Sequence, residues 1–582
     1  MKRLGFVALF VAGCALLYLL QRSKADAPFT PRPLLYLLAD TQREAERIPL
    51  TVTRVSDQDE IKAGEQIARE YGLTSQRSDN PDAARIAEYL NSVGTEVANH
   101  AQRKAIRYHF YLQDDRNFVN AFALPGGQIV VGRGLLELLE SQDELAVVLG
   151  HEIAHVDNRH AIARLQYETA SRKIGLGEVY QLGKPAVEIF ESGYTKVEEL
   201  EADRVGLGFA VAAGYSAAGG VNLMKRFEKL EPENAKRANS PVGEFAQVPF
   251  DALQEYFRSH PSPAERLAAF EVEITSRGYN QSQSIRPLAI RSIFLTDAAE
   301  RLDRAGDFKN SIARFKEALG LDPNYTRARR GLAESSWRSG DAEETVQAET
   351  EVIHRGAVTA NDWRLLARGI SVSDPVKGVS RLEALEAEKY ATPNEGNDLY
   401  VAARIELAGL EFLNHRKDSF AEVQSFLSGF SQSRAIQQRS IAWWMYRAGK
   451  LDLASQQLEA ARQLFPQSSE TAIQLALVLS DLGRQADAEQ ILSNGPIRSI
   501  SQEDVAERLA VRAVIDWRTE NRDAANRNFQ SAVKADSVWM VPRWIANNNT
   551  ASTAGVITQL QAAESSRRLK EAAARQLNEI GR

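Results

Sequence analysis

Two histidines four positions apart, His151 and His155, carry the clearest chemical signal in this chain, and Glu152 lies between them in an H-E-x-x-H pattern. On a helix, residues four positions apart project from nearly the same face, so both imidazoles can bind one metal ion. A catalytic zinc ion takes three protein ligands and leaves its fourth position to water. Glu152 follows a ligand directly and can act as the general base for that water. The pattern predicts a zinc metalloendopeptidase with one zinc ion per chain.

The third zinc ligand is expected on a second helix, where residues 198–203 contain three glutamates. Glu199 is the preferred ligand, because Asp203 lies one turn further along the same face. Asp203 can then accept the free N–H of a liganding imidazole, which is the usual partner of such a ligand. Glu201 lies far round the helix from Glu199 and remains the alternative, since both glutamates cannot face one ion.

The elements that must position these residues follow from local sequence patterns. Apolar residues at helical spacing, a capping pattern at Ser141 and β-branched runs indicate helices and strands. We expect helices over 61–71, 83–100, 141 to beyond 151, and 195–209, and strands over 106–112, 120–124 and 128–131. Residues 175–192 contain glycines and a proline and are expected to form a loop over a cleft. The peptidase part is therefore expected to be an α+β domain.

The C-terminal half contains an internal repeat. Gly306 and Gly340 are 34 residues apart, as are Gly449 and Gly483, and this is the period of tetratricopeptide repeats. Small residues and a proline recur at fixed distances after these glycines, where paired helices cross and where the second helix ends. The pattern of residues 354–440 is typical of helices but shows no clean repeat. We expect four or five repeats, with degenerate ones between them, in an all-α solenoid whose groove holds a partner or client segment.

Composition excludes several other classes of protein. The chain has 582 residues, with 71 Lys and Arg against 77 Asp and Glu and a net charge of −6. We therefore expect no nucleic-acid partner, because phosphate binding needs a basic surface. Cys14 is the single cysteine, which excludes an internal disulfide and a cysteine-rich metal module.

The N-terminus predicts export from the cytoplasm. Lys2 and Arg3 precede an uncharged apolar run from Leu4 to Leu20, which is long for the core of a signal peptide and short for a membrane span. Three interpretations stay open, namely a signal peptide cleaved near residue 27, a lipoprotein whose lipid is attached to Cys14, and an uncleaved membrane anchor. Membrane association through this segment is compatible with the last two.

Together these motifs resemble those of the HtpX/CAAX-protease-type zinc metallopeptidases. The resemblance rests on residues 151–156 with Arg159 and His160, on residues 120–127 upstream, and on Glu199, Ala202 and Asp203 downstream. Within that family, a leader, a compact peptidase domain and a tetratricopeptide tail resemble the BepA-like periplasmic proteases of the bacterial envelope. Specific motifs match over about residues 63–275. The tail shares only its repeat architecture with that family.

The resemblance implies a gluzincin-type fold and a set of residue roles. His151, His155 and Glu199 would bind zinc, Glu152 would be the general base, and Asp203 would orient a ligand. A substrate peptide would lie as an added strand along a sheet edge. The residues of that edge would be Gln128, Ile129, Val130 and Val131.

His260, followed by Pro261, matches a further feature of that family. It could approach the zinc ion as an extra ligand that keeps the enzyme latent, or stabilise the oxyanion. On spacing alone it is more typical of a surface loop. His160 lies off the face of His155 and is expected to be structural.

Two functions remain in competition. The first is a zinc endopeptidase of the bacterial periplasm that degrades misfolded or stalled outer-membrane proteins, while the repeats bind clients or the outer-membrane assembly machinery. The alternative is a periplasmic chaperone or assembly scaffold for outer-membrane proteins with a largely latent protease site. The expected domains are a signal peptide or anchor (1–27), a lead-in segment (28–60), the metallopeptidase domain (61–276), a linker (277–290) and the helical repeat domain (291–582).

Overall fold

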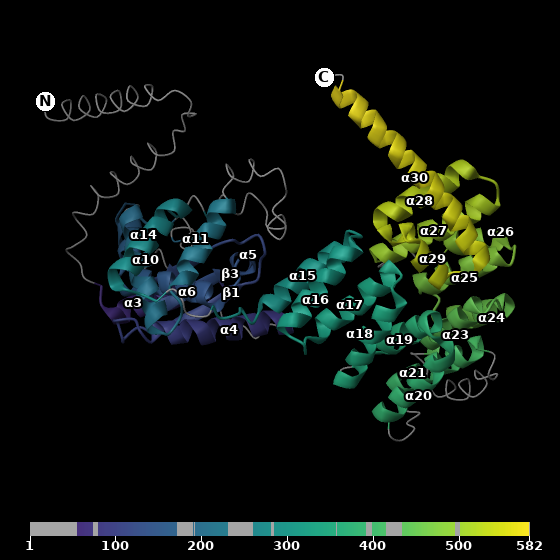
Figure 1. The fold of residues 1–582 in the computed structure, drawn as a ribbon, viewed down its shortest axis with the longest axis horizontal. Helices are drawn as coiled ribbons and strands as arrows, with labels where there is room; N and C mark the ends of the chain where they lie inside the picture. The colour runs from purple at the N-terminus through teal and green to yellow at the C-terminus, as the bar shows by residue number, and fades with distance from the viewer. Residues whose placement is uncertain are drawn as a thin grey trace. The chain divides into compact units, whose positions relative to one another are not determined.

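The computed structural model describes residues 55–73, 79–171, 190, 193–230, 256, 260–280, 285–356, 358–390, 398–414, 434–494 and 501–580. The chain divides into two compact units, Met1–Leu288 and Ala289–Arg582 (Figure 1). The expected leader and most of the lead-in segment lie outside the described residues, as does the expected loop over 175–192 apart from Phe190. Within the described part of the chain, no helix combines the length and the apolar composition of a membrane span.

The first unit consists of helices packed around a small sheet, as the predicted mainly α, α+β class requires. Its described elements are α3 Asp57–Glu70, α4 Pro81–Ala98, β1 His109–Gln113, β2 Ala121–Leu124, η2 Pro125–Gly127, β3 Gln128–Gly132, α5 Arg133–Glu137, α6 Gln142–Asp157, α7 His160–Ser171, α10 Lys196–Ala212, α11 Ala218–Leu230 and α14 Pro263–Arg277. One apolar core joins α3, β2, β3 and α7, with Ile67, Phe122, Val130 and Leu165 among its buried members.

The sheet has the strand order β1-β3-β2. In β3, Gln128 pairs with His109 of the parallel strand β1, and Val131 pairs with Ala121 of the antiparallel strand β2. The expectation that this strand is a free substrate-binding edge is therefore wrong, because both of its sides already bond to neighbouring strands. The residues concerned are Gln128, Ile129, Val130 and Val131, all of them buried. Among the described strands, the edges are β1 and β2.

The first described helix starts earlier than expected. Ser56 caps α3, and Asp57 and Glu60, which belong to the expected lead-in segment, are tied to the domain. Glu60 is fully buried and its Oε2 accepts a hydrogen bond of 2.6 Å from Arg103. Asp57 is bound by both Arg103 and Arg159. These ion pairs hold α3 against the segment that follows α4 and the turn that follows α6.

Part of the expected linker also packs on the first unit. The Arg286 N–H donates to Asp143 Oδ2 at 2.7 Å, and the Arg286 carbonyl accepts from the Gln142 N–H. The Arg286 guanidinium stacks over the ring of Tyr215 at 4.6 Å. The end of this segment is thus fixed to the first turn of α6.

The second unit is built from helices alone among its described residues, apart from one short 3₁₀ turn, η4. Most of the helices have about 14 residues and follow one another in pairs joined by short turns. Among the described residues, α21, α29 and α30 are not members of such a pair. The elements are α15 Arg291–Arg304, α16 Phe308–Leu321, α17 Thr326–Ser339, α18 Ala342–Arg355, α19 Ala360–Ser373, α20 Pro375–Lys389, α21 Asp398–Leu413, α23 Arg434–Arg447, α24 Leu451–Leu464, α25 Ser469–Asp481, α26 Gln485–Asn494, α27 Gln502–Arg518, α28 Arg522–Ala535, η4 Ser537–Met540, α29 Pro542–Asn548 and α30 Ala551–Ile580. This arrangement confirms the predicted all-α repeat class.

The glycines that revealed the repeat form the turns between paired helices. Gly306, Gly340, Gly449 and Gly483 all have φ between 71° and 83°, a left-handed conformation that favours glycine. Glu520 takes the same conformation, with φ 63°, at the corresponding turn between α27 and α28. Six helix pairs lie among the described residues, where the sequence predicted four or five repeats with degenerate ones between them. The pair α19 and α20 escaped the sequence pattern because Asp374, not glycine, lies in its turn.

Candidate metal centre

Helix α6 carries the H-E-x-x-H residues through the middle of the first unit. It begins where expected, since the Ser141 hydroxyl accepts a hydrogen bond from the Glu144 N–H. It packs against α4, α10, α11 and β2, so its side chains are buried on nearly every face. His151 and His155 leave the same face, and their Nε2 atoms lie 3.1 Å apart. Glu152 is buried beside them.

Helix α10 places its three glutamates in three different surroundings. Thr195 caps the helix and exchanges hydrogen bonds with Glu198, whose carboxylate is thereby committed to the helix start. Glu201 points outward, with 44% of its side chain exposed. Glu199 is completely buried. Burial thus separates the preferred ligand from the alternative ligand, Glu201.

Glu199 faces the two histidines of α6. Its Oε2 lies 3.4 Å from His151 Nε2, and its Oε1 lies 3.6 Å from His155 Nε2. The structure therefore brings together, from two helices about 45 residues apart in the sequence, the three residues expected to bind zinc.

Two glycines allow α6 and α10 to cross closely enough for this meeting. A Cβ atom on Gly150 would lie 2.4 Å from the Gly206 carbonyl oxygen, and one on Gly206 would lie 2.5 Å from the Gly150 carbonyl carbon. Since no real Cβ fits at such distances, any larger residue would push the helices apart. The sequence pattern did not identify this pair, although a glycine directly before His151 was a signal that could have been used.

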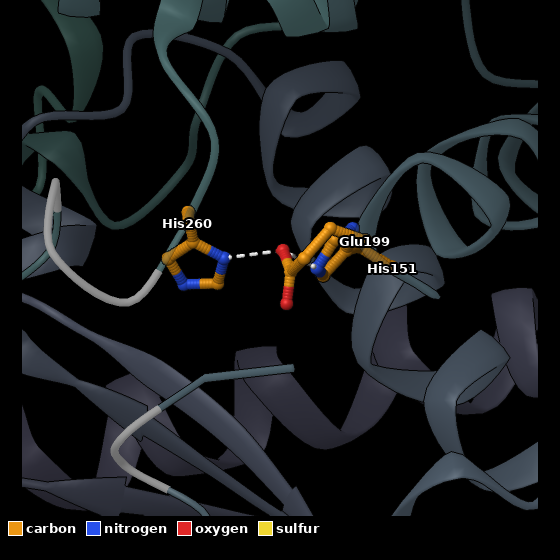
Figure 2. Close-up of side chains that lie close together, drawn as sticks. All are labelled: His151, Glu199 and His260. Atoms are coloured by element: carbon orange, nitrogen blue, oxygen red, sulfur yellow. Dashed lines mark hydrogen bonds and ion pairs between the residues drawn. The ribbon is translucent and has the colours of Figure 1, made fainter. Parts of the chain in front are cut away.

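His260 completes the cluster. Its Nδ1–H donates to Glu199 Oε2 at 2.7 Å, and Figure 2 shows the two side chains facing one another with His151 behind the carboxylate. One ligand atom from each of His151, Glu199 and His260 lies within 4.8 Å of the others. His260 is buried, so it is not the surface histidine that spacing alone favoured.

The cluster fits a cation. Glu199 Oε1 is buried and has no hydrogen-bond partner among the described residues, and such a carboxylate oxygen is costly unless a positive charge meets it. Imidazole nitrogens together with one carboxylate oxygen are a donor set that zinc prefers. The chemistry of these residues thus agrees with a zinc site.

Asp203 links His151 to a buried arginine, Arg266. The Nδ1–H of His151 donates to Asp203 Oδ1 at 2.8 Å. Arg266 donates to both oxygens of Asp203, at 2.6 and 2.9 Å, and to the Tyr256 hydroxyl at 2.8 Å. The His151 ring is therefore held by a carboxylate that is itself fixed from behind, which leaves its Nε2 directed at Glu199.

Tyr194 and His160 hold the second histidine. The ring of Tyr194 stacks on that of His155, with centroids 3.8 Å apart and planes 16° apart. His160 Nδ1 lies 3.1 Å from His155 Nδ1, and His160 Nε2 lies 3.5 Å from Glu201. A reversal of the chain at Arg159, with φ 64°, turns His160 back onto the preceding helix. Helical spacing could not reveal this contact, because His160 does not continue α6.

The buried groups of the cluster have shifted pKa values. Burial lowers the pKa of His151, but its hydrogen bonds to Asp203 and Glu199 outweigh burial and raise it to about 10. Burial raises the pKa of Glu152 to about 7, which is close to the optimum for a general base at neutral pH. Burial and the neighbouring His151 hold the pKa of His155 well below its usual value. His155 is therefore neutral, as a metal-binding imidazole must be.

Comparison with known proteins agrees with this geometry. Residues 84–274 match Peptidase family M48. The Beta-barrel assembly-enhancing protease of Escherichia coli (strain K12) is 25% identical over 224 residues, which are 36% of this chain and 41% of that protein. Metalloprotease LoiP of the same strain is 26% identical over 209 residues, 34% of this chain and 74% of LoiP. The chain thus spans about two fifths of the length of the assembly-enhancing proteases that it matches.

The comparison with solved structures also returned tetratricopeptide repeat proteins. A tetratricopeptide repeat protein from Parabacteroides merdae ATCC 43184 is 12% identical, with a TM-score of 0.27, over 47% of this chain and 98% of that one.

Proposed function

We propose that this chain, in which residues 84–274 form a domain of Peptidase family M48, is a zinc-dependent endopeptidase of the bacterial envelope that degrades misfolded or stalled outer-membrane proteins. The observation that carries the proposal is the meeting of Glu199 with His151 and His155 in a buried cluster beside Glu152. The assignment of Glu199, rather than Glu201, as the third ligand rests on the same burial.

In this proposal the residues divide the work of peptide hydrolysis. A zinc ion held by His151, His155 and Glu199 would supply Lewis-acid chemistry, polarising the scissile carbonyl and acidifying a water molecule. Glu152 takes the proton from the attacking water and passes it to the leaving amide nitrogen. Asp203 keeps the His151 ring in the orientation that ligand binding requires.

The substrate strand is proposed to add to β2. Asn120, Ala121 and Phe122, at the start of this edge strand, line the same small cavity as Glu152 and His155. A peptide paired with β2 would therefore pass in front of the general base. The Tyr194 hydroxyl donates to the Ala123 carbonyl at 3.3 Å, so an incoming amide would replace this bond.

The compartment and partners are proposed from the N-terminal sequence and from the relatives. The apolar run after Lys2 and Arg3 supports export to the periplasm, with or without attachment to a membrane. One relative bears the name Beta-barrel assembly-enhancing protease, which supports outer-membrane proteins as clients. We assign client or assembly-machinery binding to the repeats, since helical repeat arrays form extended concave surfaces.

One observation supports the alternative, a periplasmic chaperone or assembly scaffold whose protease site is largely latent. His260 forms a hydrogen bond with an oxygen of Glu199 that would otherwise face a metal ion. The Nε2 atom of His260 lies 3.4 Å from Asn120 Oδ1, next to β2. The imidazole thus lies between the ligand cluster and the edge strand. We propose that His260 restrains the protease, and that scaffold and protease activities coexist.

Replacing His260 by alanine is expected to raise casein cleavage by about tenfold, because hydrogen bonds to charged groups contribute about 1.5–3 kcal/mol. The initial rate of casein cleavage by the full chain measures the effect. His100→Ala, at an exposed position at the end of α4, is the matched control and should leave the rate unchanged. A lower rate in His260→Ala would instead assign His260 to oxyanion stabilisation and contradict the restraint.

A further inference from the structure

The second unit contains a cavity of about 290 Å³. Its lining comes mainly from the first helices of successive pairs, α17, α19, α23, α25 and α27, and from η4 and α29. Its walls combine aromatic rings, among them Trp443, Tyr446 and Trp539, with arginines and glutamates. This volume lies close to the ~300 Å³ at which small-ligand pockets begin.

Arg368 is an unpaired cation in this cavity. Its guanidinium lies over the ring of Trp443, 4.1 Å from the centroid. Its Nε is buried without a hydrogen-bond partner, and no carboxylate forms an ion pair with it among the described residues. Burial and the neighbouring Arg364 lower the pKa of Arg368 to about 9. An anion placed here would meet Arg368, which has no ion pair within the described part of the chain, and Arg364, whose Nε lies 4.0 Å from Glu406.

The third arginine of the cavity, Arg338, forms ion pairs with acidic side chains and serves as a contrast. Arg338 forms ion pairs with Asp303 at 3.0 Å and with Asp536 at 2.7 Å. It also lies 3.6 Å from Glu503. These groups neutralise one another and hold η4 against α17, so they have a structural role. The capacity to bind a ligand lies with Arg368.

Two glutamates of the cavity are unpaired as well. Glu334 of α17 and Glu507 of α27 have neither a hydrogen bond nor an ion pair among the described residues. Burial raises the pKa of Glu507 to about 7 and raises that of Glu334 above its usual value. Their oxygens are free to accept N–H groups. A ligand that suits this cavity therefore carries an anion, an apolar body and N–H donors.

We propose that this cavity binds the C-terminal residue of a client polypeptide, with the terminal carboxylate on Arg368 and Arg364 and an aromatic side chain against Trp443. A chain end carries a carboxylate and a side chain on one Cα atom, so a single residue can make both contacts. An internal acidic residue would have to lead the chain through the cavity in both directions. Glu334 and Glu507 accept backbone N–H groups of the same segment. The inference rests on the proposed client binding by the repeats.

Fluorescence polarisation with a labelled peptide tests this inference. The probe is fluorescein-labelled Ser-Gly-Ser-Gly-Ala-Phe with a free carboxylate, compared with its C-terminal amide and with an amidated peptide that carries an internal glutamate. The full chain is used with Glu152→Gln, so that the probe stays intact and the result does not depend on proteolysis. We expect the free acid to bind about tenfold more tightly than either amide.

Variants of the cavity locate the binding. Arg368→Gln should abolish the difference between acid and amide, and Arg364→Gln should reduce it. The matched control is Arg484→Gln, which lies outside the cavity with 55% of its side chain exposed. Thermal unfolding checks that each variant folds. If Arg368→Gln does not fold, Arg364→Gln alone tests whether the arginines of the cavity bind the carboxylate. Equal binding of acid and amide by the unchanged cavity, or a difference that persists in both arginine variants, would overturn the inference. Failure here would leave the protease proposal untouched, because the assay involves no cleavage.

Discussion

Glu152→Gln is expected to reduce casein cleavage by roughly 10³-fold, in the range that removal of a general base produces. The amide keeps the size of the carboxylate but cannot take a proton from water. Glu152 is buried, and its pKa of about 7 places it near the optimum for this transfer. Because it is not an expected ligand, the zinc content should stay unchanged. Initial rates of casein cleavage and zinc content of the same preparations measure both effects.

The matched control for this variant is Glu271→Gln, an exposed position on α14. It should retain the full cleavage rate. Cleavage in Glu152→Gln at a rate within a few fold of the unchanged protein would contradict the assignment of Glu152 as general base. Loss of zinc from the variant would instead show that Glu152 supports the metal cluster.

Glu199→Gln is expected to weaken zinc binding by at least about 100-fold and to abolish cleavage, since losses of 10–100-fold already follow from changes to residues around a ligand. Glu199 supplies the carboxylate that lies within 3.4 and 3.6 Å of the two α6 histidines. A neutral amide cannot balance the charge of the ion. Zinc affinity, measured by competition with a chelator, gives the result.

Glu201→Gln provides the decisive comparison, because Glu201 is the alternative ligand on the same helix. The exposed position of its side chain predicts that zinc affinity changes little. The opposite outcome, with zinc lost from Glu201→Gln and retained by Glu199→Gln, would show that the third ligand has been assigned to the wrong residue.

Residues related by helical periodicity were predictable from the sequence. The spacing of His151 and His155 placed both imidazoles on one face, and the spacing of Glu199 and Asp203 placed both carboxylates toward them. The structure brings these residues together as expected. The repeat was likewise visible where glycine marks the turn, and hidden where Asp374 takes that place.

Contacts between distant segments were not predictable in the same way. Arg266 reaches Asp203 from α14, and Tyr194 reaches His155 from the residue before the Thr195 cap of α10, and neither pair has a regular spacing. The prediction that β3 is a free edge was wrong for a related reason. The turn at Pro125–Gly127 indicated that β2 and β3 pair, but local sequence says nothing of β1, which joins the other side of β3 in parallel. Only tertiary structure therefore identifies β2 as the edge beside Glu152.

The zinc content of the purified 582-residue chain, determined by elemental analysis, tests the central claim most directly. The account predicts about one zinc ion per chain, held by His151, His155 and Glu199. Casein cleavage should disappear when a chelator removes the ion and return when zinc is restored. A chain that contains no zinc, takes up none, and keeps the same cleavage rate in chelator would contradict the assignment of the whole site.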